Sequence, residues 1–186
     1  MTFYNILFGL LFFGAIKELS AVLANYSHLR LLMVAALALT IFNDTLYTSH
    51  SLEKASAKYT VGMKLIDLGN FLILAAATYV LSPKTNLFAA VSTEFDLDPK
   101  TQTILLWLFL SMYWPLALYW NKLAGQAMPE YFKGEGWITH SMFITPFLAF
   151  LLSFFRNDTL NLSTSLLALL ALAVYVLIYK PLRPER

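Results

Sequence analysis

Residues 61–81 read VGMKLIDLGNFLILAAATYVL, and this stretch decides how the rest of the chain is interpreted. About 20 mostly apolar residues in helical conformation are needed to cross the hydrocarbon core of a bilayer, and the stretch is long enough. Its first half carries Lys64, Asp67 and Asn70, whereas its second half is almost wholly apolar. The stretch therefore predicts a membrane-spanning helix with polar side chains near one end.

The composition of the whole chain agrees with a membrane protein. Of its 186 residues, 59% are hydrophobic and 13% are charged, and the mean hydropathy is +0.63. Soluble domains are about one quarter charged and less than about half apolar, so we expect an integral, multi-pass membrane protein. The net charge of +2 is too small to indicate a nucleic-acid partner, and the absence of cysteine excludes disulfides and thiol chemistry.

Apolar stretches of suitable length recur along the chain and predict six spans. They cover residues 4–24, 29–48, 61–82, 103–123, 137–155 and 161–180. The first stretch lacks a basic segment before it and a small-residue cleavage site after it, so it is interpreted as a span instead of a signal peptide. The separating loops are too short for a soluble domain. We therefore expect an all-α fold, a single six-span domain over residues 1–186.

The loop charges predict the orientation, because Lys and Arg favour the cytoplasmic side. The side that carries both termini collects Lys54, Lys58, Lys122, Lys133, Lys180, Arg183 and Arg186. The opposite side collects Arg30, Lys84, Lys100 and Arg156. This excess predicts that both termini are cytoplasmic.

With this orientation, polar residues of four spans fall at one depth. At 1.5 Å per residue, Asp67 lies about 9 Å and His140 about 5 Å inside the cytoplasmic boundary. The predicted layer in the inner leaflet consists of Asp44, Lys64, Asp67, Asn70, Asn121 and His140. Ionisable groups inside spans are costly and tend to face the bundle interior, so this layer is the candidate site.

Structural interpretations of the same residues stay open. Lys64 and Asp67 are three residues apart and can pair on one helix face as a staple, or Lys64 can extend toward the interface. Asp44 can belong to a frayed helix end, and His140 can bind a lipid headgroup or a carbonyl. The three histidines lack ligand spacing, and there is no Walker loop, G-x-S-x-G or H-E-x-x-H motif. We expect no metal and no cofactor.

Residues 112–152 read MYWPLALYWNKLAGQAMPEYFKGEGWITHSMFITPFLAFLL and contain a recognisable order of aromatic, polar, glycine and proline residues. They are Tyr113-Trp114, Tyr119 with Asn121, Pro129, Gly136-Trp137, His140 and Pro146. This order resembles the androgen-induced and androgen-dependent membrane proteins, small multi-span hydrolases that cleave fatty-acid esters of hydroxy fatty acids. The resemblance implies that His140 is the catalytic histidine.

The same family has a threonine nucleophile followed three residues later by Asp or Asn. Residues 64–70 resemble that segment, with Asn70 at the Asp/Asn position and Asp67 at the threonine position. This is a departure, because a carboxylate does not simply replace a hydroxyl in acyl transfer. Thr40, in another span, is the alternative nucleophile.

Three functions follow from these observations. An intramembrane hydrolase or acyl-transfer enzyme would act on lipid esters, with His140 as general base, Asp67 orienting it or acting directly, and Asn70 or Asn121 donating to the oxyanion. A transporter or channel for a proton, ion or small solute would use Lys64, Asp67 and His140, and a homo-oligomer would give it room. A structural subunit would use the polar layer only to hold helices together. The expected partners are membrane lipids and a lipid or small amphiphilic substrate, and the first function is favoured.

Overall fold

The computed structural model describes residues 6, 9–17, 28–55, 60–81, 97–127, 137–155 and 157–179, and these residues form helices and short connections without any strand. The helices are α2 (His28–Ala55), α3 (Val61–Leu81), α4 (Pro99–Ala127), α5 (Trp137–Leu152) and α6 (Asp158–Ala173), which continues into the π-helical segment η2 (Val174–Tyr179). Residues 9–17 are also helical. The all-α prediction is confirmed for this part of the chain.

Four helices of the described part are long and apolar enough to cross a membrane. These candidate spans are His28–Thr45, Val61–Leu81, Pro99–Trp120 and Asp158–Leu177. Helix α5 has 16 residues, which gives a length of about 24 Å against a hydrocarbon core of about 30 Å. The first predicted span, 4–24, lies mostly outside the described residues. A membrane protein is thus supported, whereas the count of six spans and the cytoplasmic termini remain predictions.

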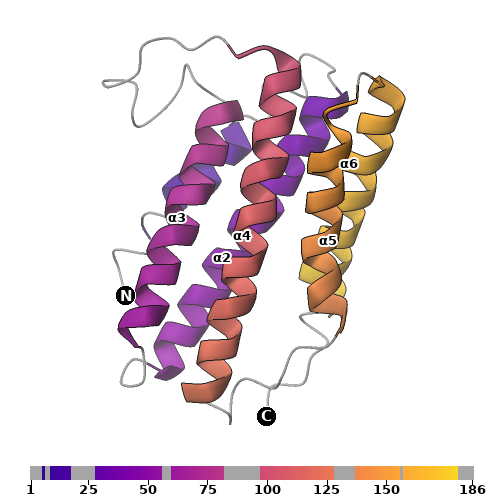
Figure 1. Cartoon of the computed structure of the whole chain (residues 1–186). Coiled ribbons are helices and arrows are strands. Elements are labelled where there is room, and N and C mark those ends of the chain that lie inside the picture. The colour runs from indigo at the N-terminus through magenta and orange to yellow at the C-terminus, as the bar shows by residue number, and fades with distance from the viewer. Residues whose placement is uncertain are drawn as a thin grey trace.

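Helices that follow one another along the chain run in opposite directions, whereas α2 and α6 run in the same direction (Figure 1). Helix α3 packs against α4, α4 against α5, α5 against α6, and α6 against α2. The beginnings of α3 and α5 and the ends of α2, α4 and η2 therefore gather at the same end of the bundle. The halves of α2, α3, α4 and α5 that carry the predicted polar residues therefore lie toward this end of the bundle.

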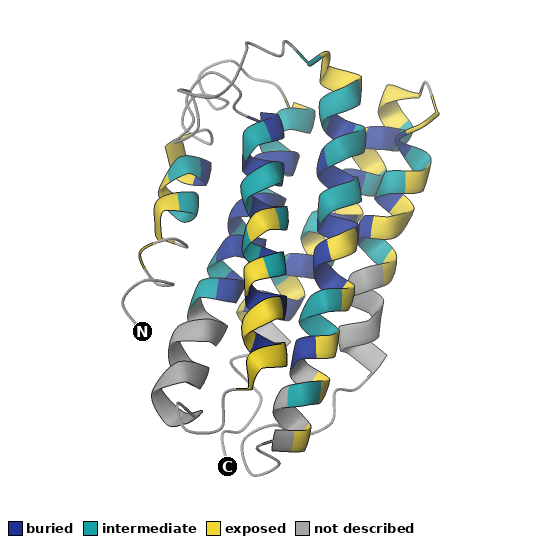
Figure 2. Ribbon diagram, turned by 60° about the vertical axis from the view of Figure 1, so that its left-hand side comes forward, coloured by how far each residue is buried: buried dark blue, intermediate teal, exposed yellow. Residues whose placement is uncertain are grey.

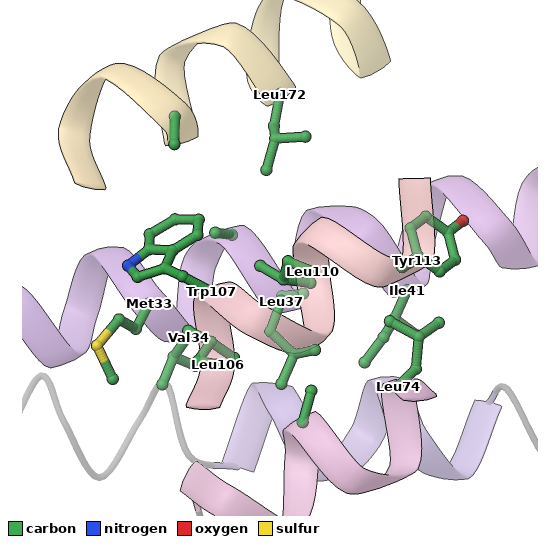
Figure 3. Close-up of a cluster of buried hydrophobic side chains, with 14 of the residues drawn as sticks. Met33, Val34, Leu37, Ile41, Leu74, Leu106, Trp107, Leu110, Tyr113 and Leu172 are labelled. Atoms are coloured by element: carbon green, nitrogen blue, oxygen red, sulfur yellow. The ribbon is translucent and has the colours of Figure 1, made fainter. Parts of the chain in front are cut away.

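The centre of the bundle is filled by large apolar side chains. Figure 3 shows residues of α2, α3, α4 and α6 meeting there, among them Leu37, Leu74, Leu110 and Leu172. Leucines such as Leu68 and Leu166 instead lie exposed on the outside, so buried faces point inward and apolar side chains also cover the exterior (Figure 2). An apolar exterior suits a lipid solvent, in which packing and interhelical hydrogen bonds hold helices together.

The helical segment 9–17 packs against α2 and α3. The rings of Phe12 and Phe42 have centroids 6.0 Å apart, and a Cβ on Gly14 would lie 3.7 Å from the methyl carbon of Thr78. Ala15, in the same segment, is 1% exposed. The segment 9–17 thus contacts both α2 and α3.

Helix α4 begins with a side-chain cap on the opposite side of the bundle from the polar layer. Oδ1 of Asp98 accepts hydrogen bonds from the backbone N–H groups of Lys100 (3.0 Å) and Thr101 (3.1 Å), and the Thr101 hydroxyl donates to Oδ2 (2.5 Å). Asp98 fills the N-cap role because these N–H groups have no partner within the helix. The Thr101 side-chain hydrogen bond, followed by the backbone ones, lowers the pKa of Asp98.

Candidate functional site

Helices α2 and α4 are joined by a buried hydrogen bond at the centre of the candidate site. The hydroxyl of Tyr113 donates to Oδ1 of Asp44 at 2.8 Å. The side chain of Asn43, next to Asp44 on α2, hydrogen-bonds to the same hydroxyl. Asp44 is 7% exposed and Tyr113 is fully buried, so this carboxylate is held inside the bundle by a partner from another helix.

Helix α3 contributes Asp67 and Asn70, which are three residues apart on its buried face. Asp67 is 4% exposed and Asn70 is 2% exposed. Oδ2 of Asp67 and Oδ1 of Asn70 are both buried and have no hydrogen-bond partner in the described structure. The charge of Asp44 acts on Asp67, so carboxylates of α2 and α3 lie within electrostatic range of each other.

We refer to Asn43, Asp44, Asp67, Asn70 and Tyr113 as the buried polar cluster. It carries two carboxylates and two amides, and it lies next to an apolar core. Buried polar atoms are nearly always paired in folded proteins, because an unpaired one costs about 1–3 kcal/mol. The unpaired oxygens of α3 therefore mark a place where a donor, a water molecule, a proton or a cation is expected.

Aromatic rings border the buried polar cluster. The indole of Trp114 contacts the rings of Tyr113 and Tyr175 edge to face, with centroid distances of 5.2 and 5.7 Å. Tyr175 belongs to η2, where the helix widens to π geometry. Such π segments occur often at functional sites. Nε1 of Trp114 is buried without a partner in the described structure, which adds an unpaired donor to the same region.

Three of the predicted site residues point into the bundle: Asp44, Asp67 and Asn70. Helix α2 continues to Ala55, so Asp44 lies well within the helix and the interpretation of a frayed end is wrong. What these residues do is not decided by their burial, and their functional roles remain predictions.

The Lys64–Asp67 pair, one of the two structural alternatives for these residues, does not form in the described structure. Lys64 is exposed whereas Asp67 is buried, and neither side chain makes an ion pair with the other in the described structure. Residues three apart are neighbours on a helix surface, about 60° apart. On α3 the buried face includes Asp67 and Asn70 but ends before Lys64, which is exposed.

Two predicted residues, Asn121 and His140, have side chains that lie outside the described part of the structure. The backbone of His140 belongs to the first turn of α5, at the end of the bundle where α3 also begins (Figure 1). The roles of His140 and Asn121 remain predictions.

The sequence did not point to Tyr113 as part of the polar layer. Tyrosines of membrane spans usually lie at the interface, and Tyr113 enters the sequence pattern only as part of a motif. Its position far from both ends of α4 was the available signal, because a buried tyrosine hydroxyl usually finds a hydrogen-bond partner. Asn43 likewise stands out in the sequence only as the neighbour of Asp44.

A metal site built from three or more ionisable side chains is not present among the described residues. No group of three or more His, Cys, Asp or Glu side chains lies close enough together to hold a metal ion there. The oxygen-bearing residues that do gather are those of the buried polar cluster, which contains two carboxylates. Oxygen ligands of this kind suit hard cations and not the metals that prefer imidazole or thiolate.

Comparisons with protein-family models, with curated proteins and with solved structures find no significant match to this chain. Its function is therefore inferred from the site itself.

Proposed function

We propose that this membrane protein is an intramembrane hydrolase or acyl-transfer enzyme for lipid esters, with Thr40 as its nucleophile. The observation that carries the proposal is the position of Thr40: it is fully buried on α2, one turn before Asp44. Covalent acyl transfer needs a hydroxyl that a nearby base can activate, and Thr40 supplies a buried hydroxyl next to polar groups.

Thr40 is a better nucleophile candidate than Asp67. The family that the chain resembles has threonine followed three residues later by Asp or Asn, and Thr40 with Asn43 has this spacing on α2. Residues at i, i+3 and i+4 share a helix face, so Thr40, Asn43 and Asp44 are directed to one side. This choice restores a hydroxyl to the position at which Asp67 is a departure.

The Thr40 hydroxyl donates to the carbonyl oxygen of Ala36 at 2.8 Å. A hydroxyl that bonds back to its own helix is held in one rotamer but keeps its lone pairs available. To react, the hydroxyl must rotate and give its proton to a base. His140 is the proposed base, because an imidazole exchanges protons near neutral pH.

The proposed reaction has two steps that balance. The Thr40 oxygen attacks the ester carbonyl, His140 takes the hydroxyl proton, and the alcohol leaves with that proton, which forms an acyl-Thr40 ester. Water then attacks the acyl carbonyl and gives a proton to His140, and the released Thr40 oxygen regains it. The products are a fatty acid and an alcohol, or a new ester when a second alcohol replaces water.

The apolar core favours a closed catalytic site and not a transport path. Next to the buried polar cluster, the interior is filled by Leu37, Leu74 and Leu110, which are at most 1% exposed. A proton or ion path would need polar groups or water through this region. An ester, in contrast, needs to reach only Thr40 and its neighbours and requires no path through the whole bundle.

The test uses a fluorophosphonate probe and fluorogenic lipid esters on purified protein in lipid nanodiscs. We expect the probe to label Thr40, identified by mass spectrometry, and ester turnover to fall at least about a thousandfold in Thr40→Ala. The His140→Ala variant should lose labelling as well, because the hydroxyl then lacks its base.

Thr45→Ala is the matched control for Thr40→Ala. The Thr45 hydroxyl donates to the Ile41 carbonyl at 2.8 Å, in the same way as Thr40. Turnover should persist in this variant. Turnover that also persists in Thr40→Ala would refute the nucleophile, and a wild-type protein that neither labels nor hydrolyses any ester would refute the hydrolase.

A further inference from the structure

Asp67 and Asn70 present two buried oxygens that the described structure leaves without a partner. Oδ2 of Asp67 and Oδ1 of Asn70 are both acceptors, and both side chains are more than nine-tenths buried. Their spacing of three residues directs them to the same face of α3. The proposed hydrolase mechanism uses neither of these atoms.

The charges around these oxygens are negative. Asp67 makes no ion pair with any basic side chain in the described structure, and Lys64 points away from it to the surface. The charge that acts on Asp67 is that of Asp44 on α2. A buried carboxylate needs a compensating positive charge or a proton, and a second carboxylate nearby increases this need.

We propose that Asp67, Asn70 and Asp44 bind a hard cation inside the bundle. Carboxylate and amide oxygens are the ligands that Na⁺, Mg²⁺ and Ca²⁺ take in proteins, with water completing the shell. The cation joins α2 to α3 and compensates the charge of their carboxylates. This site differs from the sequence-based expectation of no metal, and it does not depend on the proposed hydrolase.

A proton on Asp67 is the competing explanation. A protonated Asp67 could donate to the amide oxygen of Asn70, and this single hydrogen bond would satisfy both oxygens. A bound cation and a bound proton predict different responses to added salt at constant pH, and thermal unfolding in matched salts separates them.

The first measurement is the thermal unfolding of the wild-type protein in nanodiscs at pH 7.5. NaCl, MgCl₂ or CaCl₂ is titrated against choline chloride at matched ionic strength. At a concentration about a hundred times Kd, a bound cation should raise Tm by roughly 5–10 °C in a saturable manner. Scintillation counting with ²²Na⁺ or ⁴⁵Ca²⁺ should show binding that saturates at one ion per chain.

Three variants test whether the cation binds at the buried polar cluster. Asp67→Asn keeps the side-chain volume and removes the charge, and it should abolish both the Tm shift and the bound isotope. Asn70→Leu should weaken binding and serves as the second variant if Asp67→Asn does not fold. Asp98→Asn is the matched control, because Asp98 is an exposed carboxylate outside the cluster and Asn also caps helices.

Either of two results would overturn the proposal. One is a wild-type protein that shows no saturable shift with any of the three cations and binds no isotope, which favours the proton on Asp67. The other is an Asp67→Asn variant that binds the cation as well as the wild-type protein does. Neither result bears on ester turnover, so failure of the cation site is distinguishable from failure of the hydrolase.

Discussion

Trp107 and Trp114 are seven residues apart on α4, and their surroundings differ. Both indoles are at most 1% exposed. Nε1 of Trp107 donates to Oγ of Ser165 on α6 at 3.2 Å, whereas Nε1 of Trp114 is buried without a partner in the described structure. Trp107 belongs to the apolar core, and Trp114 borders the buried polar cluster.

This difference distinguishes the apolar core, where Trp107 is hydrogen-bonded, from the buried polar cluster, which contains unpaired polar atoms. Other buried hydroxyls of α3 and α4 are also satisfied: Thr103 donates to the Pro99 carbonyl oxygen at 2.8 Å, and Thr78 to that of Leu74 at 2.8 Å. In the buried polar cluster, by contrast, oxygens of Asp67 and Asn70 have no partner in the described structure. Unpaired buried atoms cost stability, so these oxygens point to a function of the cluster.

The largest expected effect on stability is at Trp107. Replacing this indole by Ala removes a fully buried ring from the core and leaves a cavity, so we expect a loss of about 3–5 kcal/mol in the free energy of unfolding. Reversible unfolding in mixed micelles would measure it. A loss well below 1 kcal/mol would mean that the core around Trp107 does not hold the helices together.

Tyr113→Phe should have the next largest effect. It removes the hydrogen bond to Asp44 while keeping the ring and its contact with Trp114. Because a hydrogen bond to a charged group contributes about 1.5–3 kcal/mol, a loss of this size is expected in the same unfolding measurement. An unchanged stability would indicate that water or another donor replaces the hydroxyl at Asp44.

A matched pair of substitutions tests the comparison of the two indoles directly. Ser165→Ala leaves the Trp107 N–H without its acceptor and should cost about 1–3 kcal/mol. Trp114→Phe removes an N–H that has no partner in the described structure. The penalty of burying this N–H is then relieved, which offsets part of the packing loss, so the cost for each atom removed should be smaller. An equal or larger cost for each atom removed in Trp114→Phe would contradict the assignment of Trp114 to an unsatisfied region.

The smallest effect is expected at the start of α4 and depends on pH. Because the pKa of Asp98 is lower in the folded chain than in the unfolded chain, the charged carboxylate stabilises the fold above its unfolded pKa. That contribution is lost as the pH falls through the folded value. Thr101→Val removes the main hydrogen bond, so it should lower Tm slightly at pH 7, and the difference should vanish in strong acid. A difference that persists in acid would show that the effect comes from packing.

Much of the helical architecture could be predicted from the sequence. The predicted stretch 61–82 corresponds to α3 (Val61–Leu81), and 137–155 begins with α5 at Trp137. Long apolar runs predict helices, because a chain segment in a bilayer must hydrogen-bond its own backbone polar groups and a helix does so within the segment. Asp44, Asp67 and Asn70 also stand out by residue type alone, because polar side chains within apolar runs are costly in lipid.

The sequence by itself thus determined that the chain is helical, that it suits a membrane, and which polar residues lie within its apolar runs. Only the tertiary structure decided which of these residues meet. It separated Lys64 from Asp67, joined Asp44 to Tyr113, and left oxygens of Asp67 and Asn70 without partners among the described residues. The physical reason is that hydropathy and helix length depend on local sequence, whereas hydrogen bonds between helices depend on how each helix is rotated against its neighbours.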